Sequence, residues 1–155
     1  MLLSDKVAVI YGARGAIGGA VARAFAAEGA QVFATGREVD ALDEQAVDRH
    51  LQSVIDAAGR VDISFDAIGV PDSTVVGVPL VDMDFDRFAL PIAAYTTSYF
   101  LTARLAARRM AAAEPSVPGR GIPVATVTMP GPVSSSGSGR GREPRPRLEA
   151  AASLG

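Results

Sequence analysis

The feature that most constrains the fold is a glycine-rich run, Gly12–Gly18 (GARGAIG), between two segments of different periodicity. The preceding segment, Val7–Tyr11, is short, apolar and β-rich, which predicts a buried parallel strand. The following segment, from about Ile17 to Glu28, has its apolar residues at helical spacing, and the glycine after it is typical of a helix end. A strand, a glycine-rich turn and a helix in this order favour a dinucleotide-binding turn. Glycines let the backbone approach a pyrophosphate, and free amides at the helix start face its charge.

The same pattern has a second interpretation, which the sequence leaves open. A tight turn of this kind also joins strand to helix in α/β proteins that bind no nucleotide. A P-loop is excluded, because the only lysine of the chain is Lys6, which precedes the glycines.

Strand-like and helix-like segments continue to alternate along the chain. Pro91 lies inside the longest helical segment and should kink or divide it. The expected strands are Gln31–Thr35, Val61–Ile68 and Pro123–Thr128, and the expected helices run from Asp40 or Asp43 to Ala58 and from about Asp84 to Ala112. We therefore predict an α/β fold of the Rossmann type. It is a doubly wound parallel sheet of about four strands with helices on both faces.

The amino-acid composition changes at one point in the chain, near residue 130. With 155 residues, 48% of them hydrophobic, it can bury one core, which we assign to residues 1–130. Residues 131–155 are rich in Gly, Pro, Ser and Arg, and such a tail is predicted to be disordered. The net charge of −2 gives no whole-chain reason to expect nucleic acid, and the absence of cysteine excludes disulfides. No apolar run approaches the roughly 20 residues of a membrane span and no signal peptide is evident, so we expect a cytoplasmic protein.

The turn with its neighbours, Tyr11–Gly18, resembles the fingerprint Thr-Gly-x-x-x-Gly-Ile-Gly of the short-chain dehydrogenase/reductase family. Gly12, Ile17 and Gly18 match it, whereas Ala16 replaces the middle glycine and Tyr11 the threonine. Val61–Gly69 (VDISFDAIG) resembles the family strand that ends in Asn-Asn-Ala-Gly, and the long helix and PVATVT follow in the family order. The resemblance covers about residues 5–130.

The resemblance implies a dinucleotide cofactor, and the end of the second strand indicates which one. NAD-preferring members place an acidic residue where this chain has Gly36. Arg14 and Arg37 would suit a 2′-phosphate, so we predict NADP, with NAD possible; the alternative is two solvated surface arginines. Asp40 resembles the adenine-contacting aspartate of the family, or else caps a helix. The predicted cofactor-binding residues are Gly12, Arg14, Gly15, Ala16, Ile17, Gly18, Gly36, Arg37, Asp40, Ala67 and Gly69.

Two departures from the family pattern limit what the resemblance implies. The family has another helix and strand where this chain has only Gly36–Leu42, so the outer strand and one wall of the adenine pocket are missing. The resemblance then implies a four-stranded sheet ordered 2-1-3-4 in the numbering of this chain's own strands. The family chemistry uses an Asn-Ser-Tyr-Lys tetrad with Tyr and Lys four residues apart on a helix. This chain has no asparagine, none of Tyr11, Tyr95 and Tyr99 precedes a lysine by four, and Met129 aligns with the serine. We therefore predict no catalytic residue.

Other polar residues give no further site. His50 is predicted to lie on the surface, and Asp82, Asp84 and Asp86 are interpreted as the start of a helix, not as a metal site. Three functions follow: an oxidoreductase-like chain that is catalytically incomplete, a non-catalytic nucleotide-sensing or partner-binding module, and, least favoured, a nucleic-acid binder through the arginine-rich tail. Exposed sheet edges predict self-association as a homo-oligomer.

Overall fold

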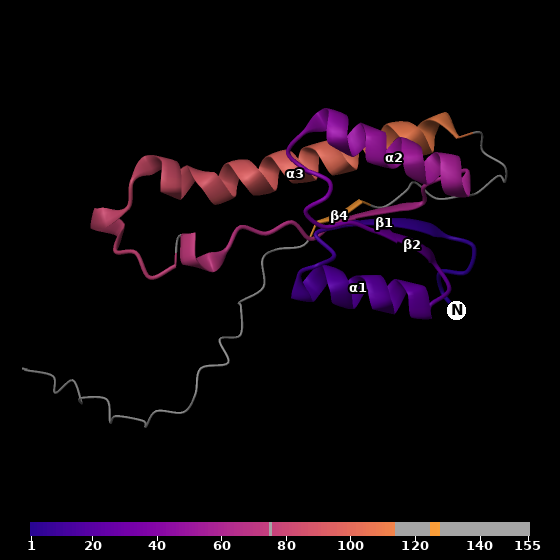
Figure 1. Cartoon of the computed structure of the whole chain (residues 1–155), viewed down its shortest axis with the longest axis horizontal. Helices are drawn as coiled ribbons and strands as arrows, with labels where there is room; N and C mark the ends of the chain where they lie inside the picture. The colour runs from indigo at the N-terminus through magenta and orange to yellow at the C-terminus, as the bar shows by residue number, and fades with distance from the viewer. Residues whose placement is uncertain (75, 114–124, 128–155) are drawn as a thin grey trace, which may run out of the picture.

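The computed structural model describes residues 1–74, 76–113 and 125–127 (Figure 1). The elements in chain order are β1 (Val7–Tyr11), α1 (Ala16–Ala27), β2 (Gln31–Ala34), α2 (Glu44–Ala58), β3 (Ile63–Asp66), the 3₁₀ turns η1 (Asp72–Thr74) and η2 (Leu80–Asp82), α3 (Phe85–Ala112) and β4 (Ala125–Val127). The tail for which disorder is predicted, residues 131–155, lies outside the described residues.

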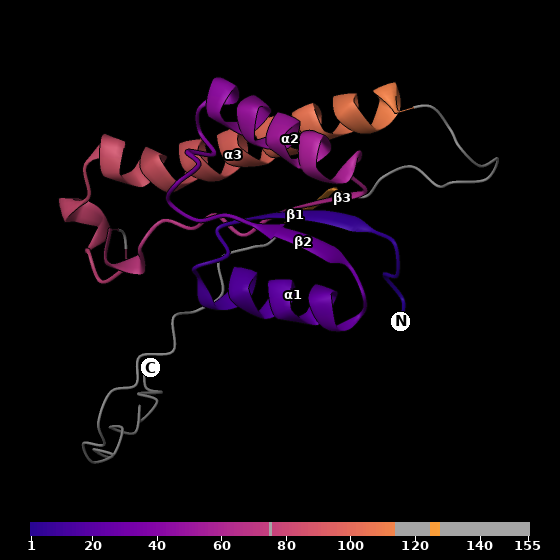
Figure 2. The same cartoon turned by 45° about the vertical axis from the view of Figure 1, so that its right-hand side comes forward.

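The strands form one parallel sheet in the order β2-β1-β3-β4, which is the predicted order. Val9 of β1 lies opposite Phe33 of β2 on one side and Ser64 of β3 on the other. Helix α1 covers one face, and α2 and α3 cover the other (Figures 1 and 2). The predicted class, a Rossmann-type parallel sheet with helices on both faces, is therefore confirmed.

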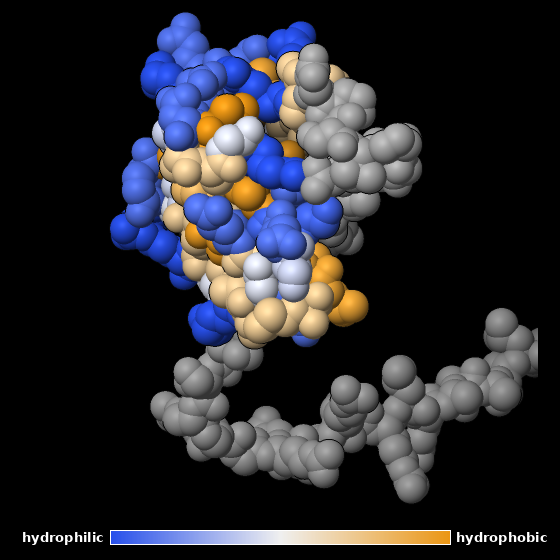
Figure 3. Space-filling view, turned by 90° about the vertical axis from the view of Figure 1, so that its right-hand side faces the viewer, coloured by the Kyte–Doolittle hydropathy of each residue, from blue (hydrophilic) through white to orange (hydrophobic). Residues whose placement is uncertain are grey.

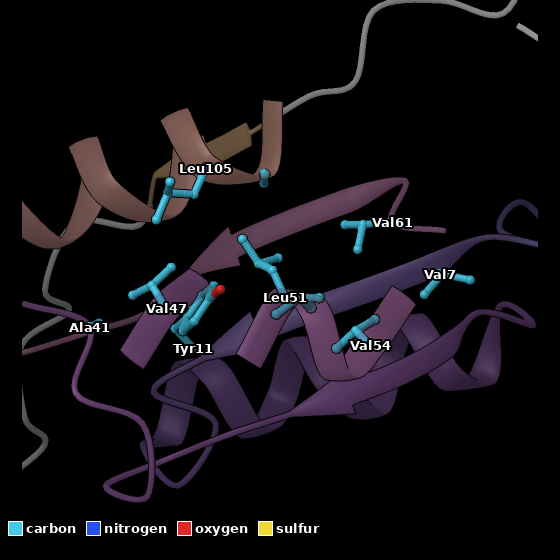
Figure 4. Close-up of a cluster of buried hydrophobic side chains, with 10 residues drawn as sticks. Val7, Tyr11, Ala41, Val47, Leu51, Val54, Val61 and Leu105 are labelled. Carbon is cyan, nitrogen blue, oxygen red and sulfur yellow. The ribbon is translucent and has the colours of Figure 1, made fainter. Parts of the chain in front are cut away.

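The main core lies between the sheet and the α2–α3 layer. All five residues of β1 are buried, as expected for the strand at the centre of a covered parallel sheet. Side chains of α2 and α3 close over it from one side (Figure 4): Val47, Leu51 and Val54 from α2 and Leu105 from α3. Complete burial of a side chain of this size is worth about 1.5–3 kcal/mol, so this layer holds β1 and the turn that follows it in place.

The start of α2 resolves an alternative that the sequence left open. Asp43 is the N-cap, and its Oδ1 accepts a hydrogen bond from the Gln45 N–H at 2.8 Å. Asp40 closes a turn of its own, because its Oδ1 accepts from the Leu42 N–H at 2.9 Å. Gly59 ends the helix in the left-handed conformation, with φ of 75°.

Helix α3 begins at the N-cap Asp84, whose carboxylate accepts from the Arg87 N–H. Of the two effects expected of Pro91, a kink or a division of the helix, the division is wrong, because Pro91 lies inside one continuous helix. Proline at this position removes only the hydrogen bond to the Arg87 carbonyl, and 28 residues of helix outweigh that loss. The amino-terminal half of α3 runs past the edge where the strands end (Figure 1).

The amino-terminal end of the sheet has a mixed surface. Hydrophilic residues there surround smaller hydrophobic patches (Figure 3).

Within the described residues, no helix has the length and apolar character to cross a membrane. Beside α2, Arg109 of α3 donates to Asp48 at 2.7 Å and to Gln52 at 2.6 Å, which ties the two helices together away from the strand ends.

Candidate functional site

The turn after β1 is closed by the backbone. Gly12 has φ of +71°, and a Cβ built on it would lie 2.5 Å from the Ala67 carbonyl oxygen. No side chain can be accommodated at that distance, so only glycine fits this position. The Ala67 N–H in turn donates to the Tyr11 carbonyl at 3.0 Å. The structure thus brings together two predicted site residues, Gly12 and Ala67, at the carboxyl ends of neighbouring strands.

Helix α1 packs directly on this turn. A Cβ on Gly18 would lie 2.5 Å from the Gly12 carbonyl oxygen and 2.9 Å from the Ala13 Cα. Gly15 closes the turn through its N–H, which donates to the Gly12 carbonyl at 3.0 Å. The two matched glycines therefore have separate roles, because Gly12 permits the turn and Gly18 permits the helix to approach it.

The first amides of α1 are free to bind an anion. The helix begins at Ala16 after Gly15, which has extended backbone angles and provides no side-chain cap. Within the described residues, no oxygen accepts from the N–H groups of Ala16, Ile17 and Gly18, because the first bond of the helix is Gly19 N–H to Gly15 O at 2.9 Å. Three unpaired donors and the positive end of the helix dipole then face the same edge.

The end of β2 adds charged side chains to that edge. The Ala13 N–H donates to the Thr35 carbonyl at 2.8 Å, which fixes the turn against the strand end. The stem of Arg14 lies over Gly36, where a Cβ would be 2.8 Å from the Arg14 Cγ and Cδ. The Arg14 guanidinium reaches Glu38 Oε1 at 2.8 Å, and Glu38 Oε2 accepts from the Gly36 N–H at 2.7 Å.

Glu38 is a residue that the sequence interpretation missed. Backbone N–H donors at Glu38 itself and at Gly36, together with Arg14, hold the pKa of its carboxyl below the usual value, so it carries a negative charge at neutral pH. The short connection Gly36–Leu42 could have predicted this role. In such a connection, an acidic side chain two residues after a glycine can turn back and accept from the glycine N–H. The predicted residues Arg37 and Asp40 lie exposed in the same connection.

Buried polar groups support the end of β3. Asp66 is 6% exposed, and its Oδ1 accepts from the Ile68 N–H at 2.7 Å. Thr102 of α3 donates to the other carboxylate oxygen at 3.4 Å. Beyond this point the Val70 N–H donates to the Tyr95 hydroxyl at 3.2 Å, while the predicted site residue Gly69 is exposed with open space around it. Tyr95 therefore joins α3 to the loop at the strand ends.

The fully buried Tyr11 and the half-buried His50 form an aromatic pair beneath the turn. Their ring centroids lie 5.8 Å apart in an edge-on arrangement. Among the described residues, neither the Tyr11 hydroxyl nor the His50 Nε2 has a hydrogen-bond partner. Burial raises the pKa of Tyr11 far above its usual value, and the negative charge of Asp66 raises it further, so this phenol is no proton donor at neutral pH.

The position of His50 corrects the expectation that it lies on the surface. It is half-buried on the inner side of α2, and burial lowers its pKa. The physical reason is visible in the spacing, because His50 follows Val47 by three residues and precedes Val54 by four, and both valines are fully buried.

The single lysine lies far from this edge in the topology. Lys6 precedes β1, and its carbonyl accepts from the Gln31 N–H at the amino-terminal start of β2. Tyr95 is at the opposite end of the parallel sheet, where the strands finish. A lysine that lowers the pKa of a tyrosine beside the turn therefore cannot come from this chain.

The covered parallel sheet, its strand order and the glycine-closed turn define a Rossmann-type fold. No family model matches the chain. A short-chain type dehydrogenase/reductase from Mycobacterium marinum is similar over 69% of this chain and 51% of its own, at 29% identity and a TM-score of 0.62. A short-chain dehydrogenase from Burkholderia cenocepacia J2315, solved in complex with NADP, is similar over 71% of this chain and 53% of its own, at 22% identity and a TM-score of 0.60.

A third solved structure, a short-chain dehydrogenase/reductase from Serratia marcescens BCRC 10948, is similar over 71% of this chain and 55% of its own, at 24% identity and a TM-score of 0.59. The described fold is thus that of part of a short-chain dehydrogenase/reductase, and the resemblance seen in the sequence is confirmed. The chain spans about half the length of the solved structures that it matches.

Proposed function

We propose that this chain is an oxidoreductase-like dinucleotide-binding protein whose turn after β1 receives the pyrophosphate of NADP(H). The observation that carries the proposal is the backbone closure of the turn. Gly12 lies against Ala67 and Gly18 against Gly12, each at a distance that excludes a side chain. Close approach of backbone to ligand, with free amides at a helix start, is the arrangement that pyrophosphate binding requires.

Two observations favour NADP over NAD. The end of β2 has Gly36 where an acidic side chain would select the ribose hydroxyl, and Arg14 lies directly over that glycine. A similar fold, that from Burkholderia cenocepacia, was solved with NADP. We assign the adenosine end to Arg14, Gly36, Arg37 and Asp40, and the remainder of the dinucleotide to the turn residues with Ala67 and Gly69.

We further propose that the chain as it stands has no dehydrogenase or reductase turnover. Reduction of a carbonyl needs a proton at the developing alkoxide, and general acid catalysis of that step contributes about 10²–10⁴-fold. Tyr11 is enclosed, and the only lysine is at the far end of the sheet, so Tyr95 and Tyr99 have no lysine to activate them. These residues therefore support binding of the dinucleotide without hydride transfer to a substrate.

The second candidate is a nucleotide-sensing or partner-binding module, which the same closed turn would serve without catalysis. Self-association through the sheet edge belongs to this candidate. β2 is an edge strand, and Gln31 and Ala34 on it are exposed without a lysine to discourage pairing. Nucleic-acid binding by the arginine-rich tail, outside the described residues, is the least favoured alternative. We place the protein in the cytoplasm on its sequence alone.

Calorimetric titration of the purified chain with NADP, NAD and a single-stranded RNA, each at low and high salt, separates these functions. Salt-resistant NADP binding supports the first two, and NADPH oxidation with any of a panel of carbonyl substrates would contradict the proposed lack of turnover. RNA binding that falls steeply with salt, without NADP binding, would contradict both.

A further inference from the structure

Glu38 already occupies the polar donors at the end of β2. One carboxylate oxygen accepts from the Gly36 N–H at 2.7 Å, and the other accepts from the Arg14 guanidinium at 2.8 Å. Both donors lie beside the turn, since the Arg14 stem rests on Gly36 and the Ala13 N–H is bonded to the Thr35 carbonyl. The Glu38 carboxylate is thus an anion of the chain itself that occupies the end of β2 beside the turn.

These donors are also the ones that a ligand phosphate would use. A phosphate monoester carries nearly two negative charges at neutral pH and is bound by guanidinium and backbone N–H groups. It cannot share the donors with an ionised carboxylate, because the two anions repel at hydrogen-bonding distance. A ribose hydroxyl differs, since it can donate to a carboxylate.

We propose that Glu38 determines cofactor specificity by competing with the 2′-phosphate of NADP for Arg14 and the Gly36 amide. This inference rests on the proposed function, since it assumes that the adenosine end of a dinucleotide lies at this corner. NADP must displace the carboxylate to reach Arg14, whereas NAD leaves it in place and donates its 2′-hydroxyl to it. The intact chain therefore discriminates between the two cofactors less than Arg14 and Gly36 would by themselves.

The Arg14–Glu38 ion pair is exposed enough for a phosphate to replace the carboxylate. The side chains of Arg14 and Glu38 are 72% and 53% exposed, so water weakens their attraction and can solvate either partner once they separate. Gly36 lets Arg14 lie flat over the connection, from where its long side chain can turn from Glu38 to a bound phosphate. Displacement thus requires movement of two surface side chains and no change in the turn.

The test is Glu38→Gln, titrated with NADP and with NAD in the full chain. We expect the dissociation constant for NADP to fall about three- to tenfold, as for an exposed charge pair whose competing anion is removed, while that for NAD stays equal or rises. Glu28→Gln is the matched control, because Glu28 is partly exposed and also accepts a backbone N–H, that of Leu2, but at the other end of the sheet. It should change neither constant.

A second variant keeps the result interpretable. In Arg14→Gln, replacing Glu38 should improve NADP binding less than it does in the unaltered chain, because only the Gly36 amide remains contested. Unchanged or weaker NADP binding in Glu38→Gln, with NAD binding intact, would overturn the inference and show that Glu38 positions Arg14 instead. If neither nucleotide binds to any variant, while thermal unfolding shows all of them folded, the proposed function fails first and the specificity role fails with it.

Discussion

The two halves of the candidate site are built in different ways. At the turn, backbone atoms meet backbone atoms, and Cβ atoms on Gly12 and Gly18 would each come within 2.5 Å of a carbonyl oxygen. At the end of β2, two exposed side chains meet across a single ion pair. The comparison shows that the backbone determines where a pyrophosphate would lie. The preference between NADP and NAD at the adenosine end would instead depend on exposed side chains.

The largest expected effect is on the rigid half. Gly12→Ala combines a positive φ with a collision against the Ala67 carbonyl, whereas Gly59→Ala has φ of +75° and nothing within 4 Å. We predict a loss of about 1–2 kcal/mol in unfolding free energy for the control, and at least about 3 kcal/mol for Gly12→Ala. Urea unfolding measures both. Equal losses would show that the turn is looser than the distances indicate.

The second prediction concerns the half that is built from exposed side chains. Arg37→Asp places a negative charge beside the proposed 2′-phosphate position, so NADP binding should weaken about tenfold while NAD binding changes about twofold or less. The unfolding free energy should stay the same, because Arg37 is exposed. Titration with both cofactors checks this, and an equal loss for both would remove Arg37 from the site.

A smaller effect is expected where α2 starts. Asp43→Ala removes the side chain that caps the Gln45 N–H and should cost about 1 kcal/mol in unfolding free energy. Asp40→Ala is the comparison, since Asp40 closes a local turn and does not cap the helix. Asp40→Ala should cost less in stability, but it should weaken dinucleotide binding if Asp40 contacts adenine. Chemical unfolding and titration of the two variants separate capping from binding.

The last effect is a pH dependence beneath the turn. His50 has a lowered pKa in the folded chain because its half-buried ring, which lies against Tyr11, is partly removed from water. The folded state therefore favours the neutral ring, so its stabilising contribution is complete above the unfolded pKa of about 6.5 and is lost as pH falls below that value. His50→Phe should remove this loss between about pH 7 and 5. An unchanged acid profile in that variant would assign the dependence to carboxyl groups.

The covered parallel sheet was predictable from the sequence because it depends on burial, and the strand order followed from the family resemblance. Apolar runs such as Val7–Tyr11 alternate with amphipathic segments, and a covered parallel sheet follows. The tight turn was predictable because glycines between a strand and a helix allow the backbone to pass closely, as it does at Gly12 and Gly18.

The rest depends on where single side chains turn, which periodicity does not determine. Glu38 was missed because its role requires the connection after β2 to fold back on Gly36. His50 was misplaced because its polar neighbours outweighed its spacing from the buried Val47 and Val54. Asp43 and Asp40 were both plausible caps, and only the geometry distinguishes them.

One measurement tests the central claim most directly, and it compares NADP with 2′,5′-ADP in calorimetric titrations of the intact chain. The two share the adenosine end and its 2′-phosphate, but only NADP has the pyrophosphate that the turn would bind. Contacts from free helix amides to a charged ligand predict that NADP binds at least about tenfold more tightly, a difference that Gly18→Ala should reduce. Equal affinities, or no binding of NADP to a folded chain, would contradict the proposal that this turn is a pyrophosphate site.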